Sequence, residues 1–148
     1  MRQRQAAMKQ QREAEFAERR KAATEKGHSI LDASEPCPDD HMYLRGKGVP
    51  ALGEIRRGRH AAILLPIRDA SRNLLSLQRI FNNGQKRFLT GGKVSGGYYV
   101  IQGKPEKPLV ICEGYATGAS IHLASGSTVY VAFSASNLSN IASIVRRA

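Results

Sequence analysis

Residues 109–133 read LVICEGYATGASIHLASGSTVYVAF, and their pattern is the clearest indication of the fold class. The run 109–112 is apolar and β-branched, and 116–124 has the small residues of a helix packed closely on a sheet. Gly126 can end that helix, and a second apolar run follows at 128–133. Both runs are apolar throughout instead of alternating with polar residues. They therefore indicate buried parallel strands that are joined by a right-handed crossover.

A further helix is expected from Ser136 onward. Four apolar side chains recur there at helical spacing and share one face: Leu138, Ile141, Ile144 and Val145. Residues 106–148 thus form a strand–helix–strand–helix unit. Two parallel strands are too few for a sheet covered by helices, so another part of the chain, or residues beyond it, must supply more strands.

The preceding segment, residues 61–105, is expected to be rich in β-structure. Turn residues separate its short apolar stretches, which lie at 61–67, 74–81, 87–89 and 98–101. Asn83-Gly84 is typical of a two-residue hairpin loop, because both residue types tolerate positive φ. The spacing of these stretches predicts an antiparallel β-meander.

The N-terminal residues 1–27 form a basic helical arm with too weak an apolar stripe to bury much surface. Gly27 is the expected end of this helix. Residues 28–60 contain several prolines and glycines, and they are expected to form an irregular connection with short helical pieces.

Composition narrows the function further. The 148 residues carry 23 Lys and Arg against 12 Asp and Glu, a net charge of +11 that favours a nucleic-acid or nucleotide partner. A basic tail kept for solubility is the alternative. No apolar run is long enough to span a bilayer, and the charged N-terminus is unlike a secretory signal, so we expect a cytoplasmic protein. Cys37 and Cys112 are too few for a disulfide framework.

Basic residues gather around the turns and strands of the predicted meander. They form a basic rim suited to backbone phosphates, and we take them as the candidate nucleic-acid-binding residues: Arg68, Arg72, Arg79, Lys86, Arg87 and Lys93. An ordinary solvated sheet face is the alternative interpretation.

Glu113 is the candidate catalytic residue. It follows an apolar strand, where ligands bind in open α/β sheets, and Gly114 allows a tight turn beside it. A carboxylate there can take a proton from a hydroxyl or help to hold Mg²⁺. The alternative is an acid favoured only by the dipole of the following helix.

The identity of these residues adds a family resemblance. Glu113-Gly-Tyr-Ala-Thr117 after a strand, followed by Val129-Tyr-Val-Ala-Phe133, resembles the Toprim domain of bacterial primases and topoisomerases. Upstream, Leu65-Pro-Ile-Arg-Asp69 and Gly91-Gly92 look like the Toprim-containing primases or primase-helicases of phages and plasmids. The resemblance covers roughly residues 41–142. The expected fold is mixed α+β or α/β, with a basic helix, an antiparallel meander and a partial Toprim-like parallel βαβα unit.

The resemblance implies a nucleotidyltransferase that makes RNA primers on single-stranded DNA from nucleoside triphosphates with Mg²⁺. Glu113 matches the family's glutamate, a general acid or base at the 3′-hydroxyl or phosphate and a contributor to the metal site. Gly114 matches the glycine beside it, and we count both as catalytic-site residues. A replicative helicase is a candidate partner.

The chain departs from the Toprim pattern in one respect. A Toprim site also uses an Asp-x-Asp pair after a later strand, whereas no Asp or Glu follows Glu113 here. One carboxylate cannot supply the metal ligands that phosphoryl transfer needs. We therefore expect a truncated or degenerate domain that is inactive alone. A non-catalytic, basic nucleic-acid-binding or accessory module derived from the same fold is the rival hypothesis.

Overall fold

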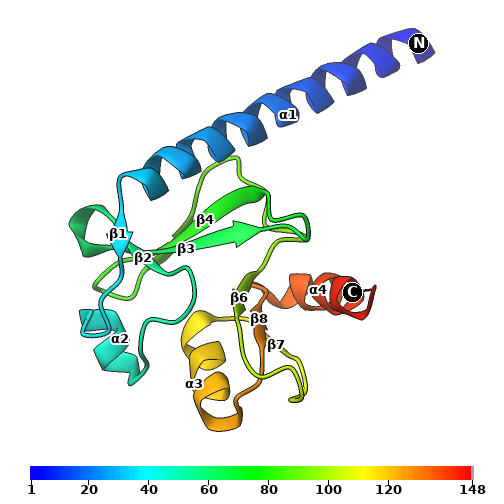
Figure 1. Ribbon diagram of the computed structural model, residues 1–148. Helices are drawn as coiled ribbons and strands as arrows, with labels where there is room; N and C mark the ends of the chain where they lie inside the picture. Colours follow the sequence, from blue (N-terminus) through cyan, green and yellow to red (C-terminus); the bar gives the residue numbers. More distant parts are fainter. Residues whose placement is uncertain (148) are drawn as a thin grey trace.

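Two β-sheets and the helices that cover them organise the chain, which is described over residues 1–147 by a computed structural model (Figure 1). The last residue of the predicted C-terminal unit, residue 148, lies outside this part. The helices are α1 (Arg2–Asp32), α2 (Met42–Lys47), α3 (Tyr115–Ser125) and α4 (Ala135–Arg147), with a 3-10 turn, η1, at Arg59–Ala61. The strands are β1 (Glu35–Pro36), β2 (Arg56–Arg57), β3 (Ile63–Arg68), β4 (Leu74–Ile80), β5 (Lys86–Phe88), β6 (Tyr99–Ile101), β7 (Val110–Cys112) and β8 (Val129–Val131). None of the helices in residues 1–147 has the length and apolar character needed to cross a membrane.

The first sheet, sheet A, is antiparallel and has the order β1-β2-β3-β4-β5. The hairpins β3–β4 and β4–β5 confirm the meander for these three strands. The loop at Asn82–Gly84 forms where Asn83-Gly84 predicted a hairpin, but it is one residue longer. Phe81 N–H donates to the Gln85 carbonyl at 2.9 Å, and within the loop only Gly84 has a left-handed φ, of 84°.

The second sheet, sheet B, is mixed and has the order β6-β8-β7. The pair β7–β8 is parallel, which confirms the prediction from the continuous apolar runs. The predicted meander was wrong at its last strand, because β6 leaves sheet A and pairs antiparallel with β8. Its remaining link to sheet A is a bridge between Arg68 and Tyr98. Strand β6 thus supplies a strand that the parallel pair lacked.

Helices α3 and α4 lie on opposite faces of sheet B (Figure 1). Gly118 allows α3 to approach closely, since a Cβ there would lie 3.0 Å from Cys112 Sγ. Gly126 ends α3 in the left-handed conformation, as predicted. On the other face, α4 packs the side chains predicted to share its apolar face: Leu138, Ile141, Ile144 and Val145.

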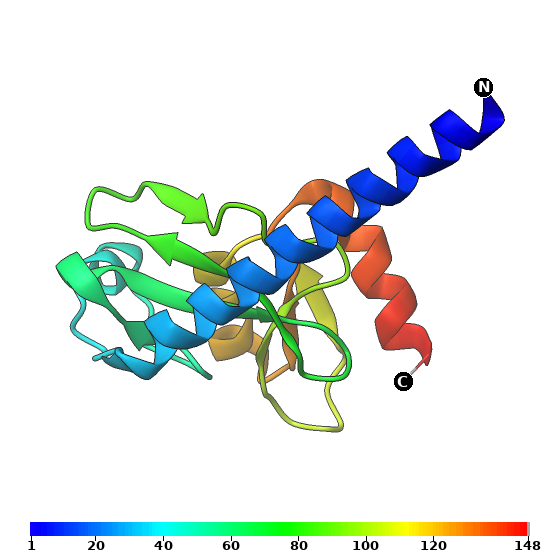
Figure 2. The ribbon, with the colours of Figure 1, turned by 90° about the horizontal axis from the view of Figure 1, so that it is seen from above.

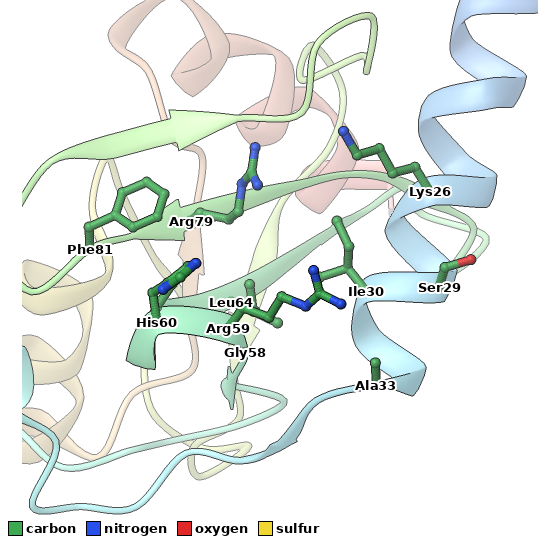
Figure 3. Close-up of a pocket in the computed structure, with 11 residues that line it drawn as sticks. Lys26, Ser29, Ile30, Ala33, Gly58, Arg59, His60, Leu64, Arg79 and Phe81 are labelled. Atoms are coloured by element: carbon green, nitrogen blue, oxygen red, sulfur yellow. The ribbon is translucent and has the colours of Figure 1, made fainter.

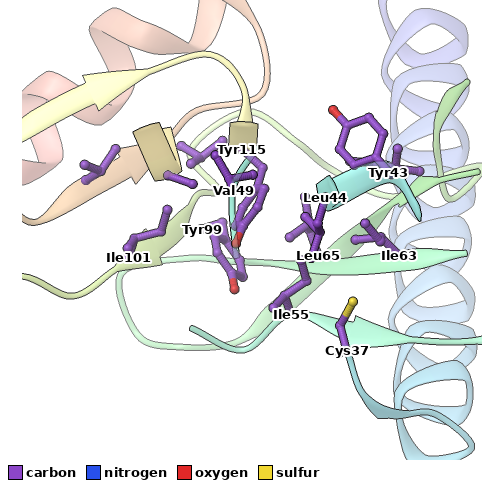
Figure 4. Close-up of a cluster of buried hydrophobic side chains, with 14 of the residues drawn as sticks. Cys37, Tyr43, Leu44, Val49, Ile55, Ile63, Leu65, Tyr99, Ile101 and Tyr115 are labelled. Atoms are coloured by element: carbon purple, nitrogen blue, oxygen red, sulfur yellow. The ribbon is translucent and has the colours of Figure 1, made fainter. Parts of the chain in front are cut away.

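The main core lies between the two sheets and is closed by α2 and α3 (Figure 4). Leu44 from α2 and Leu65 from β3 are fully buried in it. Tyr99 of β6 and Tyr115 of α3 meet edge-to-face, with ring centroids 5.9 Å apart. This shared core joins the β-rich segment to the βαβα unit.

Helix α1 continues to Asp32, so the expected helix end at Gly27 was wrong. Gly27 is a packing residue, because a Cβ there would lie 3.0 Å from Leu74 Cδ2 and 3.4 Å from Leu89 Cδ1. Thr24 Oγ1 also donates to the Leu74 carbonyl at 3.2 Å. The C-terminal half of α1 therefore lies on sheet A, while its N-terminal half projects away from the body (Figure 2).

We expect Gly27→Leu to lower the free energy of unfolding by about 1–3 kcal/mol, because the added side chain overpacks the contact with Leu74 and Leu89. Urea denaturation followed by circular dichroism measures this effect. The matched control is Gly46→Leu in α2, where an added Cβ meets no atom within 4 Å. Equal stability of the two variants would show that α1 does not depend on the Gly27 contact.

Candidate functional site

Glu113 and Gly114 lie where β7 ends and α3 begins, with Gly114 as the N-cap of the helix. Phe133 N–H donates to the Glu113 carbonyl at 2.9 Å, so the carboxyl ends of β7 and β8 meet at this point. The Glu113 side chain is exposed, and within residues 1–147 it forms no hydrogen bond or ion pair. Its carboxylate is therefore free to contact a ligand at this edge of sheet B.

Lys86 of β5 reaches the same place from the other sheet. Lys86 pairs with Ile80 across β4–β5, and residues directly opposite each other share a sheet face, so its side chain lies on the core-facing side of sheet A. A Cβ on Gly114 would lie 3.9 Å from Lys86 Nζ. The ammonium group thus stands beside the N-terminus of α3, where a positive charge and the helix dipole both attract anions.

Two phenylalanines extend this edge. Phe88, which remains 39% exposed, meets Phe133 edge-to-face with ring centroids 6.1 Å apart. Phe133 has a φ of 72°, a left-handed conformation that phenylalanine rarely adopts. Its surroundings hold it in this strained conformation at the end of β8, which is the kind of distortion that gathers at functional sites.

The residues after Phe133 anchor the start of α4. Ser134 and Ser136 share a hydrogen bond of 3.2 Å at the exposed edge. Asn137 is 2% exposed, and its Nδ2 donates to the carbonyls of Gly97 and Ala132, each at 2.9 Å. This side chain fixes the loop before β6 against α4. Sequence reasoning missed it, because nothing local distinguishes it from a surface asparagine at a helix start.

Tyr115, the first residue of α3, links the start of the helix to the segment between α2 and β2. Its hydroxyl donates to the Pro50 carbonyl at 2.7 Å and accepts from Leu52 N–H at 2.8 Å. Burial raises the pKa of Tyr115 to about 12, and it also raises the pKa of Tyr99 above its ordinary value. Tyrosine is neutral at pH 7 in any case, and the raised pKa keeps both hydroxyls neutral to a higher pH than in the unfolded chain.

These pKa values predict how stability depends on alkaline pH. Tyrosine in the unfolded chain ionises near pH 10, below the pKa of Tyr115 in the folded chain. The unfolded state therefore loses its protons first, and the contribution of Tyr115 declines from about pH 10 until it is lost near pH 12. We expect Tyr115→Phe to lower stability at pH 7 by about 1–3 kcal/mol, through two lost hydrogen bonds, and to flatten the fall above pH 10. Urea denaturation at pH 7–11 tests this, and an equally steep fall in the variant would contradict it.

Two of the predicted nucleic-acid-binding residues are already paired. Glu54 forms ion pairs with both Arg68 and Arg72. Arg68 Nη2 lies 3.1 Å from Glu54 Oε2. The three side chains gather at the end of the β3–β4 hairpin. Sequence reasoning missed Glu54, which lies outside the meander, and this carboxylate offsets part of the expected positive charge.

The other four predicted residues are divided among three places. Arg79 and Arg87 are cross-strand partners, and they lie on the face of sheet A that α1 covers. Lys86 lies on the opposite face beside Gly114, and Lys93 is exposed in the loop that follows β5. The structure brings only Lys86 to the candidate catalytic residues.

The donor set here does not fit a magnesium ion. Glu113 is followed by Gly114, which the cation Lys86 approaches, and residues 1–147 contain no group of three His, Cys, Asp or Glu that could hold a metal. Mg²⁺ prefers an octahedral set of oxygen ligands. We therefore derive no metal-dependent step from this chain.

Comparison with known proteins shows which proteins this chain is related to. A curated protein from Escherichia coli, DNA primase TraC, is 32% identical to the chain over 147 aligned residues, which cover 93% of the chain. The chain is homologous to a segment of DNA primase TraC. A second DNA primase TraC from Escherichia coli is 30% identical over 118 residues, which cover 76% of the chain. No family model matches the sequence, and no solved structure matches it.

The match to DNA primase TraC is confined to a small part of those proteins. The chain spans 14% of the length of the first relative and 8% of the second. The similarity therefore relates this chain to a segment of a primase. It does not by itself assign the activity of the whole relative to this chain.

Proposed function

We propose that this chain is the segment of a Toprim-type DNA primase that binds single-stranded DNA and nucleotides. The observation that carries the proposal is the approach of Lys86 to Gly114 and of Phe88 to Phe133, at the carboxyl ends of β7 and β8 where Glu113 lies. Homology to a segment of DNA primase TraC supports the choice of activity.

Lys86 and the first turn of α3 are proposed to hold phosphate groups. Lys86 Nζ supplies a mobile positive charge, and the N-terminal N–H groups of an eleven-residue helix supply donors. An alanine Cβ at Gly114 would meet only Lys86 Nζ, at 3.9 Å, so there is open space for a ligand at this residue. A phosphate of a template strand or of an incoming nucleoside triphosphate fits this chemistry.

Phe88 and Phe133 are proposed to receive a base. Aromatic side chains beside a cationic group are the usual platform for single-stranded nucleic acid, because any base can stack on them. Bases in a duplex are already stacked, so this platform favours a single strand.

Glu113 is proposed to act as general base at the 3′-hydroxyl of the growing primer. An exposed carboxylate on the residue before Gly114 can accept the hydroxyl proton, while Lys86, which approaches Gly114, balances the charge of the phosphate. The metal ligands that primer synthesis also needs are not gathered within residues 1–147. Within residues 1–147, we assign no residue to a contact with the helicase that the resemblance implies.

Salt dependence of binding tests the proposal. Fluorescence anisotropy with a labelled oligothymidylate should show binding whose log–log slope against salt concentration is about −0.7 per phosphate contacted. A duplex of the same length, which offers no free bases, should bind less tightly. A flat salt response, or equal affinity for the duplex, would contradict the proposed recognition of phosphates and bases.

A further inference from the structure

A pocket lies on the far side of sheet A from Glu113. It has a volume of about 480 Å³ and is formed between the C-terminal half of α1, the turn η1 and the face of β3 and β4 that α1 covers (Figure 3). Leu64 and Arg79, which are cross-strand partners, form its floor. Lys26 and Ile30 line it from α1, and Phe81 lines it at the end of β4.

The pocket is strongly basic. Lys26, Arg59, His60 and Arg79 all line it, and none of its lining residues is acidic. Within residues 1–147, none of its Lys or Arg side chains takes part in an ion pair. Arg87, the cross-strand partner of Arg79, adds another positive charge on the same face of the sheet. An anion is the ligand that this charge distribution favours.

Arg79 gives the most specific indication that an anion binds in this pocket. Its Nε is shielded from solvent and has no hydrogen-bond partner, which is uncommon for a buried N–H group. In Figure 3 the charged ends of Arg79 and Lys26 point toward the same space between β4 and α1. A phosphate group in that space would satisfy Arg79 and neutralise both cations.

Apart from Ser29, the rest of the pocket lining has no polar side chain, and the pocket is too large for phosphate alone. Leu64, Ile30 and Phe81 surround the basic groups, and the phenylalanine offers a ring face or edge to a flat aromatic group. We infer that the pocket binds a nucleotide, with its phosphates at Arg79 and Lys26 and its base among Phe81, Leu64 and Ile30. The nucleotide is either a free nucleoside phosphate or one unit of a single strand.

This inference goes beyond the proposed function, because the pocket and the candidate site use opposite faces of sheet A. Arg79 faces α1, whereas Lys86 faces sheet B and Gly114. A ligand in the pocket would contact none of Lys86, Phe88 and Glu113. Variants of the two sites can therefore be tested separately.

Isothermal titration calorimetry on the whole chain tests the inference, with ATP, adenosine, inorganic phosphate and oligothymidylate as probes. We expect ATP to bind at least tenfold more tightly than adenosine or phosphate. Arg79→Met and Lys26→Gln should each weaken ATP binding at least tenfold. Lys21→Gln, an exposed lysine on the same helix that does not line the pocket, is the control and should bind as the unchanged chain does.

Arg79→Met also separates binding from folding. It removes the unpartnered buried Nε and keeps an apolar stem of similar length, so its urea unfolding midpoint should equal or exceed that of the unchanged chain. Should only the oligothymidylate bind, with its affinity lowered in Arg79→Met and Lys26→Gln but not in Lys21→Gln, the nucleotide is a unit of a strand. Should neither ATP nor oligothymidylate binding respond to Arg79→Met and Lys26→Gln, the inference is overturned, whatever Lys86→Ala does.

Discussion

Primer synthesis should fall by about 10²–10⁴-fold when Glu113→Gln is introduced into a primase that carries this segment. That range is the usual contribution of a positioned general base. The amide keeps the size of the side chain but cannot take the proton of the 3′-hydroxyl. The fold should be unaffected, because Glu113 is exposed and its carboxylate forms no hydrogen bond within residues 1–147.

The control for this loss is Glu106→Gln, which removes an exposed carboxylate from the loop between β6 and β7. A primer-extension assay with labelled nucleotides compares the two variants, and circular dichroism confirms that both are folded. If both variants retain synthesis, Glu113 is not the general base. If the Glu113→Gln variant also binds single-stranded DNA as tightly as the unchanged protein, the result would favour the hypothesis of a non-catalytic accessory module.

The second large effect concerns single-stranded DNA binding by the chain itself. We expect Phe88→Ala to weaken binding by roughly 5–150-fold, because a base stacked on an aromatic side chain contributes about 1–3 kcal/mol. The exposure of Phe88 and its edge-to-face contact with Phe133 are the basis for this expectation. Fluorescence anisotropy with oligothymidylate measures the change.

Lys86→Ala should weaken the same binding and reduce the steepness of its salt dependence by about 0.7, which corresponds to one phosphate contact. Matched controls are Phe16→Ala in α1, whose ring is exposed, and Lys104→Ala in the loop after β6. Losses of equal size in the controls would show that binding follows overall charge and hydrophobicity instead of this site.

Much of the C-terminal unit could be predicted from sequence, because its signals are local. Continuous apolar runs at β7 and β8 indicated parallel strands, and Gly126 indicated the end of α3. The partner of β6 was not predictable in this way. A three-residue strand carries too short a pattern to choose between two sheets, and the loop before β6 is held against α4 by Asn137, a contact between residues about 40 positions apart in the chain.

The C-terminal end of α1 was also not predictable from local sequence. Glycine commonly follows a helix end, so Gly27 was interpreted locally, whereas its role is set by contact with Leu74 and Leu89 far along the chain. The candidate site was predictable only in part. The position of Glu113 after a strand indicated it, but the approach of Lys86 to Gly114 and the pairing of Phe88 with Phe133 depend on how the two sheets pack.

Nuclear magnetic resonance of the ¹⁵N-labelled chain, titrated with oligothymidylate, shows whether DNA binds where β5 approaches the carboxyl ends of β7 and β8. We expect the largest amide shifts at residues 86–88, 113–116 and 133–136. Shifts confined to the N-terminal half of α1, with residues 113–116 unchanged, would show that DNA contacts only the basic arm and would rule out binding at Glu113, Lys86 and Phe88.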